Sequence, residues 1–469
     1  MRLGSVHVGD LIDEGRRLTG GFHLAEDQQI IHVLDHYVRA GRFLPLKSLT
    51  TGRRVFRGPI FKRIFATDSA HGRPYVSAAD LVQIDVNPTK YLSNRHGSLL
   101  EELSIRSGWI LVTCSGMNLG KAIWAREEMD GLCASHDLIR IEPNESEAPP
   151  GYVFAFLSSR FGRVSIRKQI YGGNIKHIEP QHILDLPVPR LGAAIELKIH
   201  EMIVEAASLR TSASEQLAQA TKDLERELSV PAIHQGSSAR SLGHNVTSAE
   251  LQRARRLEAF FFNPVSLSLV RWAEDHEWGA WTLGEVADVY DVPPFKHIYV
   301  DGAFGVPFYT SGDLFHLDRT VEKYLSTKLT RNLSKYVIEQ GWILLARSGQ
   351  LGGIIGRLSF ADSTMHRVTT SDHVIRVIPR EHRIPAGYLY AYLAAPNIGY
   401  PLLTRTMTGA SVPALWPSQL TTIPVVKARP EFMHVTDRLV RDAFEKRARA
   451  ATLDAQAQEL VERAIEESI

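Results

Sequence analysis

Features typical of secreted, membrane-spanning and disulfide-rich proteins are scarce in this sequence. Its 469 residues include only two cysteines, Cys114 and Cys133, which are too few for a disulfide framework. No run approaches the roughly 18 apolar residues that a membrane span needs, and the opening MRLGSVHVGDLIDEG is too polar for the core of a signal peptide. We therefore expect a cytoplasmic protein that has no membrane partner.

Enzyme signatures are also missing. GMNLGKA (116–122) is too short between its glycines for a phosphate-binding loop, and Ala122 stands where that loop needs Ser or Thr. In DVPPF (291–295), Val292 separates the acid from the prolines, unlike the Asp/Asn-Pro-Pro-aromatic motif of adenine methyltransferases. Neither G-x-S-x-G nor metal-ligand spacing occurs, so we expect a chain that catalyses no reaction itself and binds no metal or other cofactor.

Size and charge allow several classes of protein. The chain is long enough for two or three domains, and 44% of its residues are hydrophobic, which is enough for packed cores. The net charge is only +2, so overall charge does not by itself predict a nucleic-acid partner.

An internal duplication spans most of the chain. GWILVTCSGMNLG begins at Gly108, and GWILLARSGQLGG begins at Gly341. Further pairs keep the same order: RRL (16–18 and 255–257), FKRIFATDSAHGRPYVSAADL (61–81) with FKHIYVDGAFGVPFYTSGDL (295–314), KYLS (90–93 and 323–326), PPGYVFAFLSS (149–159) with PAGYLYAYLAA (385–395), and IEPQHILDLPVP (178–189) with LWPSQLTTIPVV (415–426). Each copy is far longer than the about 20–50 residues of a solenoid repeat, so the sequence predicts a duplicated domain.

Each copy is predicted to be mixed α/β. GWILVTCSG and GWILLARSG indicate apolar strands that end in a Ser-Gly turn. DLIRIEP and HVIRVIP alternate apolar and polar residues, which favours half-buried strands. GYVFAFLSS and GYLYAYLAA favour short amphipathic helices, entered at proline.

A long helix is predicted after each copy, over 193–229 and from Glu431 onward. Apolar residues recur at steps of mostly three or four, which is typical of a coiled-coil seam: Ile195, Ile199, Met202, Ala206, Leu209, Ala213, Ala220, Leu224 and Leu228 in the first helix, and Phe432, Val435, Leu439, Ala443, Ala450, Leu453, Ala457, Leu460 and Ala464 in the second. We expect an antiparallel pair that separates the two copies. The alternative is that each helix packs on its own globular domain.

These patterns divide the chain into five parts: a first α/β domain (1–190), a long helix (191–228), a linker rich in Ser and Gly (229–250), a second α/β domain (251–428) and a second long helix (429–469).

This arrangement resembles the specificity (S) subunit of type I restriction-modification systems. The resemblance rests on the order domain, helix, domain, helix, on G-W-I-L-x-x-x-S-G in each copy and on the R-R-L opening followed by aromatic residues. It implies two target recognition domains, each reading one half of an asymmetric, split sequence in double-stranded DNA. It also implies that the helices set the spacer and dock two methyltransferase (M) subunits, with restriction/translocase (R) subunits as further partners. S-adenosylmethionine, ATP and Mg are then expected only on those partner subunits.

Candidate DNA contacts come from basic stretches with aromatic or glycine neighbours, because Arg and Lys bind phosphate and Arg also reads guanine. In the first copy they are Arg53, Arg54, Arg57, Lys62 and Arg63, followed by Arg167, Lys168, Tyr171, Gly173, Asn174 and Lys176. In the second copy they are Lys296, His297, Arg347, Arg405, Thr406, Thr408 and Ser411.

Two polar positions per copy have a plainer interpretation. Ser115 and Ser348 lack the surroundings of a nucleophile, so the Ser-Gly turn is expected to shape the backbone or offer N–H groups to phosphate. SHDLIR and SDHVIR exchange the order of His and Asp, which favours packing at a strand edge over a catalytic geometry. The main alternative function is a scaffold that carries two interaction modules on a coiled-coil spacer and does not bind DNA.

Overall fold

A computed structural model describes residues 25–116, 118–171, 176–231, 245–318, 321, 323–409 and 411–467. Its contacts divide the chain into two compact units, Met1–Thr211 with Arg449–Ile469, and Ser212–Ala448. Each unit therefore contains one sequence copy and a part of each long helix. We call them unit 1 and unit 2.

A four-stranded antiparallel sheet forms the centre of each copy. In unit 1 its order is β2-β9-β6-β7, with bounds Thr50–Arg57, Leu138–Pro143, Ile110–Thr113 and Ala122–Trp124. In unit 2 the order is β12-β19-β16-β17, with bounds Ala287–Tyr290, Val374–Pro379, Ile343–Ala346 and Leu358–Phe360. The strands predicted before the Ser-Gly turns are thus confirmed as β6 and β16.

Two further sheets recur in both copies. A small sheet has the order β3-β5-β4-β8 in unit 1 (Phe65–Ala66, Lys90–Ser93, Gly72–Val76, Cys133–Ala134) and β13-β15-β14-β18 in unit 2 (Tyr299–Val300, Tyr324–Ser326, Gly305–Tyr309, Thr369–Thr370), and its last strand pairs in parallel. A two-stranded pair closes each domain: β1 (Phe43–Pro45) with β10 (Pro187–Pro189), and β11 (Ala280–Thr282) with β20 (Pro424–Val426). The duplication therefore extends from sequence to topology, and the mixed α/β fold is confirmed.

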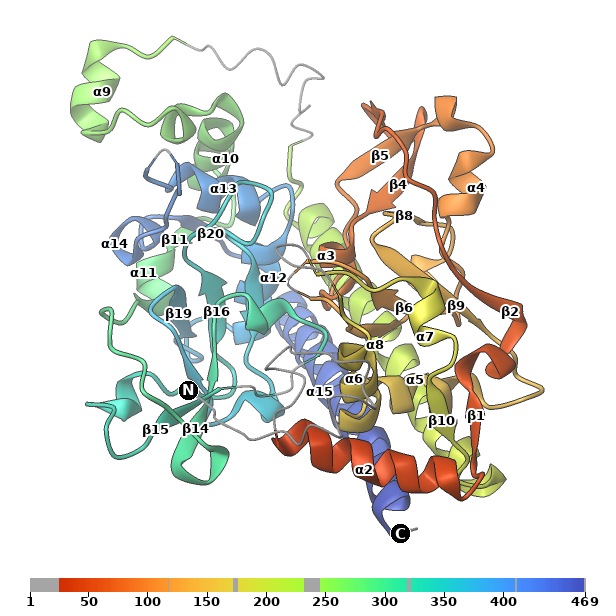
Figure 1. Ribbon diagram of the computed structural model, residues 1–469. Helices are drawn as coiled ribbons and strands as arrows, with labels where there is room; N and C mark the ends of the chain where they lie inside the picture. Colours follow the sequence, from red (N-terminus) through yellow and green to blue (C-terminus); the bar gives the residue numbers. More distant parts are fainter. Residues whose placement is uncertain are drawn as a thin grey trace. The chain divides into compact units, whose positions relative to one another are not determined.

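Helices cover these sheets (Figure 1). In unit 1 they are α2 (Ala25–Arg39), α3 (Ala78–Leu81), α4 (Leu99–Leu103), α5 (Pro150–Ser158), α6 (Arg160–Lys168) and α7 (Pro180–Ile183). In unit 2 they are α10 (Pro264–Glu274), α11 (Leu283–Val286), α12 (Ala386–Ala394), α13 (Gly399–Arg405) and α14 (Pro417–Leu420), whereas α9 (Ser248–Ala254) has no buried residue and lies apart from the sheets. Among the described residues, none of the helices combines the length and apolar character that crossing a membrane requires.

The expected half-buried strands and amphipathic helices need correction. Residues 138–141 of β9 and 374–377 of β19 are all buried, including Arg140 and Arg376, because each strand lies inside its sheet and is covered on both faces. Helices α5 and α12 are buried all round from their first residue, which is typical of a core helix.

A glycine allows each core helix to approach a long helix closely. A Cβ at Gly151 would lie 2.9 Å from the Cα of His200, and one at Gly387 would lie 2.7 Å from the Cα of Asp437. The Gly151 N–H donates to His200 Nδ1 (3.0 Å), and the Gly387 N–H donates to Asp437 Oδ1 (2.7 Å). The glycine shared by the PPGY and PAGY motifs thus lets a long-helix side chain accept a hydrogen bond from the first turn of the core helix.

The two long helices are α8 (Ala193–Glu227, 35 residues) and α15 (Pro430–Glu466, 37 residues). In unit 2 they run antiparallel: the Arg429 guanidinium, at the start of α15, pairs with Glu227 at 2.7 Å, and Gln216 bonds to Asp442 at 2.8 Å. Both helices also contribute to the hydrophobic core of each unit, through Ile199 and Val461 in unit 1 and through Leu224 and Val440 in unit 2. The helix pair and the packing on globular domains therefore occur together.

The predicted seam is confirmed in part: the buried positions include Ile199, Ala206, Ala213, Ala220, Leu224 and Leu228 for the first helix and Ala443, Ala450 and Ala457 for the second, whereas the other predicted positions are not buried. The observed seam contains Ile199, Ile203, Ala206, Arg210, Ala213, Ala220 and Leu224 in α8, with Leu228 directly after it, and Thr436, Val440, Ala443, Arg447, Ala450, Ala457, Val461 and Ile465 in α15. Met202 and Leu209 were expected where Ile203 and Arg210 are buried. Most missed positions lie one residue before the buried one, and apolar spacing also passes over two buried arginines, Arg210 and Arg447. One of them, Arg210, is stabilised by Asp454 at 2.7 Å.

Candidate nucleic-acid interface

Sheet topology brings several loops of each copy to one edge. Strands β2 and β6 both end beside the start of β9, because Arg57 pairs with Ile139 and Thr113 pairs with Leu138. In unit 2, Tyr290 pairs with Arg376 and Ala346 with Val374, so β12, β16 and β19 meet in the same way. In unit 1, the loops after β2 and β6 and the segment before β9 therefore lie together. In unit 2, the loops after β12 and β16 and the segment before β19 do the same. We call this edge the loop edge of each copy.

A fourth segment is joined to the loop edge by backbone hydrogen bonds that recur in both copies. Tyr171 and His177 exchange N–H···O bonds (3.1 and 2.9 Å), and the Ile178 N–H donates to Cys114 O (3.1 Å). Thr408 and Ala414 exchange equivalent bonds (2.9 and 2.8 Å), and the Leu415 N–H donates to Arg347 O (2.8 Å). The glycine-containing loops predicted to read DNA thus begin and end at the Ser-Gly turn.

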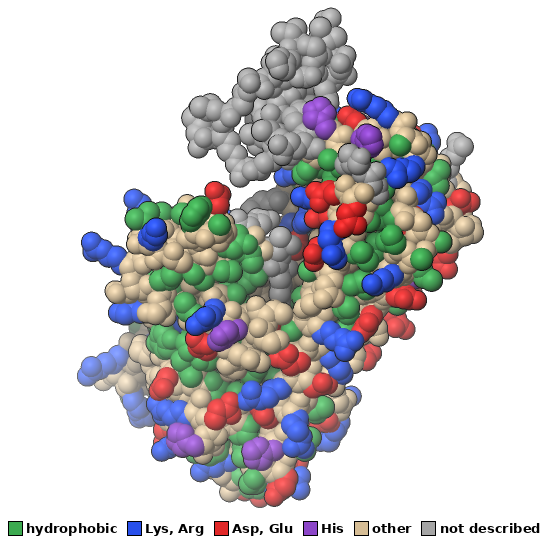
Figure 2. All heavy atoms as spheres, turned by 90° about the horizontal axis from the view of Figure 1, so that it is seen from below, with side chains coloured by type: hydrophobic (Ala, Val, Ile, Leu, Met, Phe, Trp, Pro, Cys, Tyr) green, Lys and Arg blue, Asp and Glu red, His purple; other side chains and the backbone are tan. Residues whose placement is uncertain are grey.

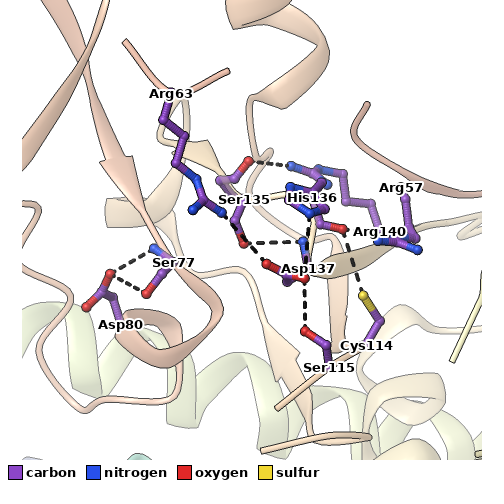
Figure 3. A network of polar contacts seen from close by, with 11 residues as sticks. Arg57, Arg63, Ser77, Asp80, Cys114, Ser115, Ser135, His136, Asp137 and Arg140 are labelled. Atoms are coloured by element: carbon purple, nitrogen blue, oxygen red, sulfur yellow. Dashed lines mark hydrogen bonds and ion pairs between the residues drawn. The ribbon is translucent and has the colours of Figure 1, made fainter. Parts of the chain in front are cut away.

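A polar network lies at the loop edge of unit 1 (Figure 3). The Ser115 hydroxyl donates to Asp137 Oδ1 at 2.9 Å, and the Asp137 N–H donates to Ser135 Oγ at 3.3 Å. The Arg63 guanidinium lies 3.9 Å from the Asp137 carboxylate on its other side. The Asp137 side chain, which is 33% exposed, is therefore held between a hydroxyl and a cation.

The equivalent serine of unit 2 has a different partner. Ser348 Oγ lies 3.0 Å from His373 Nδ1, where unit 1 has Asp137. The two copies therefore share the serine and its position but not the group that faces it. This difference supports the expectation that the serines are not nucleophiles, because a shared reaction would need a shared base.

A buried arginine underlies the loop edge in each copy. Arg140 and Arg376 are 0% exposed, and their guanidinium groups donate to backbone carbonyls. Arg140 bonds to Leu103 O (3.0 Å) and Ala134 O (3.2 Å), and Arg376 bonds to Val374 O (2.5 Å) and to Thr370 Oγ1 (2.7 Å). Burial lowers the pKa of both guanidinium groups to about 10. They fix the segment that carries residues 135–137 or 371–373, and sequence pattern alone did not identify them.

Predicted contact residues of unit 1 fall into exposed and engaged groups. Lys62, Arg63, Tyr171 and Lys176 are exposed at the loop edge, as is Ile60 at 82%. Arg57 is engaged: Nη1 lies 2.5 Å from Glu179 Oε1, and Nε donates to His136 O at 2.9 Å. Burial alone would lower the pKa of Arg57, but the bond to Glu179 and nearby negative charges raise it overall.

The remaining unit 1 candidates lie elsewhere or outside the described residues. Arg54 is on β2 and pairs with Glu142 (2.8 Å) at the other end of β9. Arg167 and Lys168 form the last turn of α6. Arg53 belongs to β2, but its side chain lies outside the described part of the chain, as do Gly173 and Asn174.

In unit 2 an arginine–tryptophan pair dominates the loop edge. Arg347 lies 3.1 Å from Asp291 Oδ2, and its guanidinium is 4.4 Å from the centre of the Trp416 ring. Trp416 Nε1 donates to Thr408 Oγ1 at 2.7 Å. Thr408 is thus oriented by Trp416, a residue that the sequence pattern did not single out.

The other unit 2 candidates differ in exposure. Lys296 and Ser411 are exposed. His297 is half-buried between the rings of Phe295 (4.6 Å) and Phe308 (4.8 Å), and burial lowers its pKa, so it is neutral at pH 7.

Arg405 and Thr406 do not present their side chains as free surface groups. Thr406 is buried, and its hydroxyl donates to Leu403 O (2.8 Å). The Arg405 guanidinium stacks on Phe261 at 3.8 Å, and burial lowers its pKa. Their place is structural because they lie at the C-terminal end of α13, just before Thr408, where the glycine-containing loop begins.

Arg256 is a further residue that the sequence pattern did not assign. Its side chain is 9% exposed and donates to Met407 O (2.8 Å) and Gln419 Oε1 (2.9 Å). It belongs to the R-R-L opening of the second copy, so this motif ties the start of the domain to the base of the loop at Thr408. The matching motif of the first copy, at 16–18, lies outside the described residues.

Basic and acidic side chains intermingle over the described residues on the face in Figure 2, with exposed hydrophobic side chains among them. No group of three or more His, Cys, Asp or Glu side chains suited to a metal ion occurs in the part of the chain that the structure describes. The loop edges thus offer side chains for hydrogen bonding and phosphate contact.

Comparison with known proteins finds similarity in solved structures alone, since neither a family model nor a curated protein matches the chain. The S subunit of a type I restriction-modification system from M. genitalium is 12% identical, with a TM-score of 0.38, and the match covers 90% of this chain and 94% of that one. The HsdS subunit from Thermoanaerobacter tengcongensis is 16% identical, with a TM-score of 0.27 and coverage of 91% and 97%.

A third similar chain comes from a structural study of complex assembly and conformational transition in the type I R-M system. It is 17% identical, with a TM-score of 0.28 and coverage of 90% and 97%. With every TM-score below 0.5, the likeness assigns no role to any residue of this chain. Over most of its length, the chain is thus similar to S subunits of type I restriction-modification systems.

Proposed function

We propose that this chain is a DNA-specificity subunit of a type I restriction-modification complex, and that each copy reads one half of a split target. The observation that carries the proposal is the loop edge, which occurs in both copies on the same backbone frame but with different side chains. In unit 1 it presents Lys62, Arg63 and Lys176. In unit 2 it presents Lys296, Thr408 and Ser411.

The chemistry of these side chains suits base reading with phosphate anchoring. Lysine and arginine at exposed loops neutralise phosphates, which fixes register without reading sequence. Hydroxyl, carboxylate and imidazole groups can bond to base edges, where the major groove distinguishes all four base pairs. Because the two copies differ at these groups, the proposal predicts a target whose halves differ.

The helix pair is proposed to fix the spacer between the half-sites and to dock methyltransferase subunits. Helices of 35 and 37 residues span roughly 50–55 Å at 1.5 Å per residue. That length exceeds the about 34 Å of one DNA turn, the usual separation of half-sites. The partner subunits would supply the cofactors and the reaction, and this chain would supply only recognition.

The test is long-read modification sequencing of host DNA with and without the gene, with the neighbouring methyltransferase gene intact. The proposal predicts that a methylated split motif disappears when the gene is deleted and returns when it is supplied from a plasmid. An unchanged methylome, together with no salt-dependent DNA binding by the purified complex, would favour the scaffold that does not bind DNA.

A further inference from the structure

The two copies hold a guanidinium group against the same backbone carbonyl, but the arginine comes from different strands. In unit 1, Arg57 at the end of β2 donates from Nε to His136 O at 2.9 Å. In unit 2, Arg347 directly after β16 donates from Nη1 to Asp372 O at 3.4 Å. The duplication aligns His136 with Asp372, because each follows a serine and precedes the central strand by two residues.

The same alignment shows that three neighbouring positions have changed together. Phe61 and Phe295 place Arg57 opposite Asp291, and the shared serines place Cys114 opposite Arg347. Glu179 and Trp416 also correspond, because each comes directly before a proline that the two copies share. The set Arg, Cys, Glu of unit 1 is therefore Asp, Arg, Trp in unit 2.

Each set contains one arginine and one acid in contact. Arg57 pairs with Glu179 at 2.5 Å, and Arg347 pairs with Asp291 at 3.1 Å. The arginine has moved from the first position to the second, and the acid from the third to the first. Trp416 occupies the vacated third position and stacks on the guanidinium at 4.4 Å.

Cys114 of unit 1 lies close enough to the His136 carbonyl that an arginine in its place could take over the contact made by Arg57. The Cys114 thiol interacts electrostatically with Arg57, Asp137 and Glu179, and burial raises its pKa to about 11, so it is neutral. Its sulfur lies 3.8 Å from His136 O, the carbonyl that Arg57 binds. Figure 3 shows the contact of Cys114 with this carbonyl, with Arg57 nearby.

The burial of Arg57 and Arg347 indicates that they position the backbone and do not contact a ligand. Their side chains are only 20% and 14% exposed and are already bonded to a carbonyl and a carboxylate. The residue after each bound carbonyl is Asp137 or His373, which contacts the shared serine and keeps part of its side chain exposed. The guanidinium therefore fixes the backbone that presents this side chain.

We propose that Arg57 and Arg347 are equivalent positioning residues rather than DNA contacts, and that Asp137 and His373 are the specificity-determining residues that they present. The reading role rests on the proposed function. A carboxylate only accepts hydrogen bonds, which suits a base amino group such as that of cytosine, whereas an imidazole can also donate. The exchange of arginine and acid preserved the position of the guanidinium while the residue it presents changed.

The experiment uses the full chain with its methyltransferase partners and four versions: wild type, Arg57→Gln, Arg57→Asp/Cys114→Arg, and the control Arg106→Gln. Arg106 is a surface arginine of unit 1 that pairs with Glu101 at 3.0 Å, away from the loop edge. The double variant rebuilds in unit 1 the Asp–Arg pair of unit 2. Hydrogen exchange of the amides of 135–138 and discrimination between cognate and altered half-sites are both measured.

We expect Arg57→Gln to speed amide exchange at 135–138 and to reduce discrimination at one half-site by about tenfold, the effect of losing one good base contact. The slope of affinity against salt should stay constant, since a positioning residue neutralises no phosphate. The double variant should restore slow exchange and most of the discrimination, and Arg106→Gln should match wild type.

Unchanged exchange in Arg57→Gln, or a double variant that exchanges as fast as Arg57→Gln, would overturn the positioning role. A salt slope lowered by about one in Arg57→Gln would assign Arg57 to a phosphate contact instead and would also overturn it. Absence of half-site discrimination in the wild-type complex would contradict the proposed function, while the exchange data would still decide the positioning role.

Discussion

The two copies of this chain differ least in backbone and most in the side chains at the loop edge. Both close the glycine-containing loop with the same pair of backbone bonds, at Tyr171 and at Thr408. Both also bury an arginine under the edge. Yet the group facing the shared serine is Asp137 in one copy and His373 in the other. Under the proposed function, such a division lets each copy recognise a different half-site on the same backbone frame.

The largest effect is expected where the copies agree. Arg140→Met and Arg376→Met should each destabilise the unit that contains it by about 3 kcal/mol, because buried carbonyl oxygens lose their donors. Urea unfolding, with limited proteolysis to assign the unit that opens, measures this loss. If one substitution destabilises its unit and the other does not, the two copies do not depend on the buried arginine in the same way.

The helix pair should respond next. Arg210→Ala leaves Asp454 without its partner in a mostly buried position, so we expect a loss of about 2 kcal/mol in unit 1. The double variant Arg210→Leu/Asp454→Leu should recover most of it, because two apolar side chains suit the seam. If the double variant is as unstable as Arg210→Ala, the ion pair itself stabilises the seam. The loss in Arg210→Ala would then not come from leaving the Asp454 carboxylate unpaired.

DNA binding should show that unit 1 depends more on charge than unit 2. Lys62→Ala/Arg63→Ala should lower the slope of log affinity against log salt by about two, and Lys296→Ala by about one, since each phosphate contact contributes about one. Affinity titrations of the complex at several salt concentrations give these slopes. Equal changes from both variants would remove this contrast between the copies.

The smallest effect concerns the Arg256 anchor, which is described only in unit 2. The hydrogen bond from Arg256 lowers the pKa of Glu258 below its ordinary value of 4.5. Its contribution, about 0.5 kcal/mol for a partly exposed pair, is therefore present above pH 4.5 and is lost as the pH falls through the folded-state pKa. Unfolding of wild type and Glu258→Gln between pH 3 and 7 should show a gap that closes on acidification, and a constant gap would contradict this pairing.

Much of the architecture could be predicted from the sequence, because local patterns carry it. The duplication, the strands before the Ser-Gly turns and the long helices follow from apolar periodicity and from breaker residues. Periodicity did not predict the four buried arginines, because it treats arginine as exposed, whereas tertiary partners can bury it. These residues are Arg140, Arg210, Arg376 and Arg447. The prediction of half-buried strands was wrong for this reason, and the predicted seams missed Arg210 and Arg447, although half of the predicted seam residues are buried.

The loop edge could be predicted only in part. Basic stretches located Lys62, Arg63 and Lys296, but they could not distinguish exposed arginines from the paired Arg57 and Arg347. Trp416 and Arg256 act through residues far away in sequence, and only the fold brings those residues together. Comparison of the two copies, position by position, is the sequence signal that could have revealed the exchange of arginine and acid.

The most direct test of the central claim is the methylome of a host that carries a chain with the second copy in both places. Residues 43–189, bounded by β1 and β10, would be replaced by residues 280–426, bounded by the equivalent β11 and β20. If each copy reads one half-site, the methylated motif should become a split sequence whose two halves are the same. A motif that keeps two different halves would contradict the account.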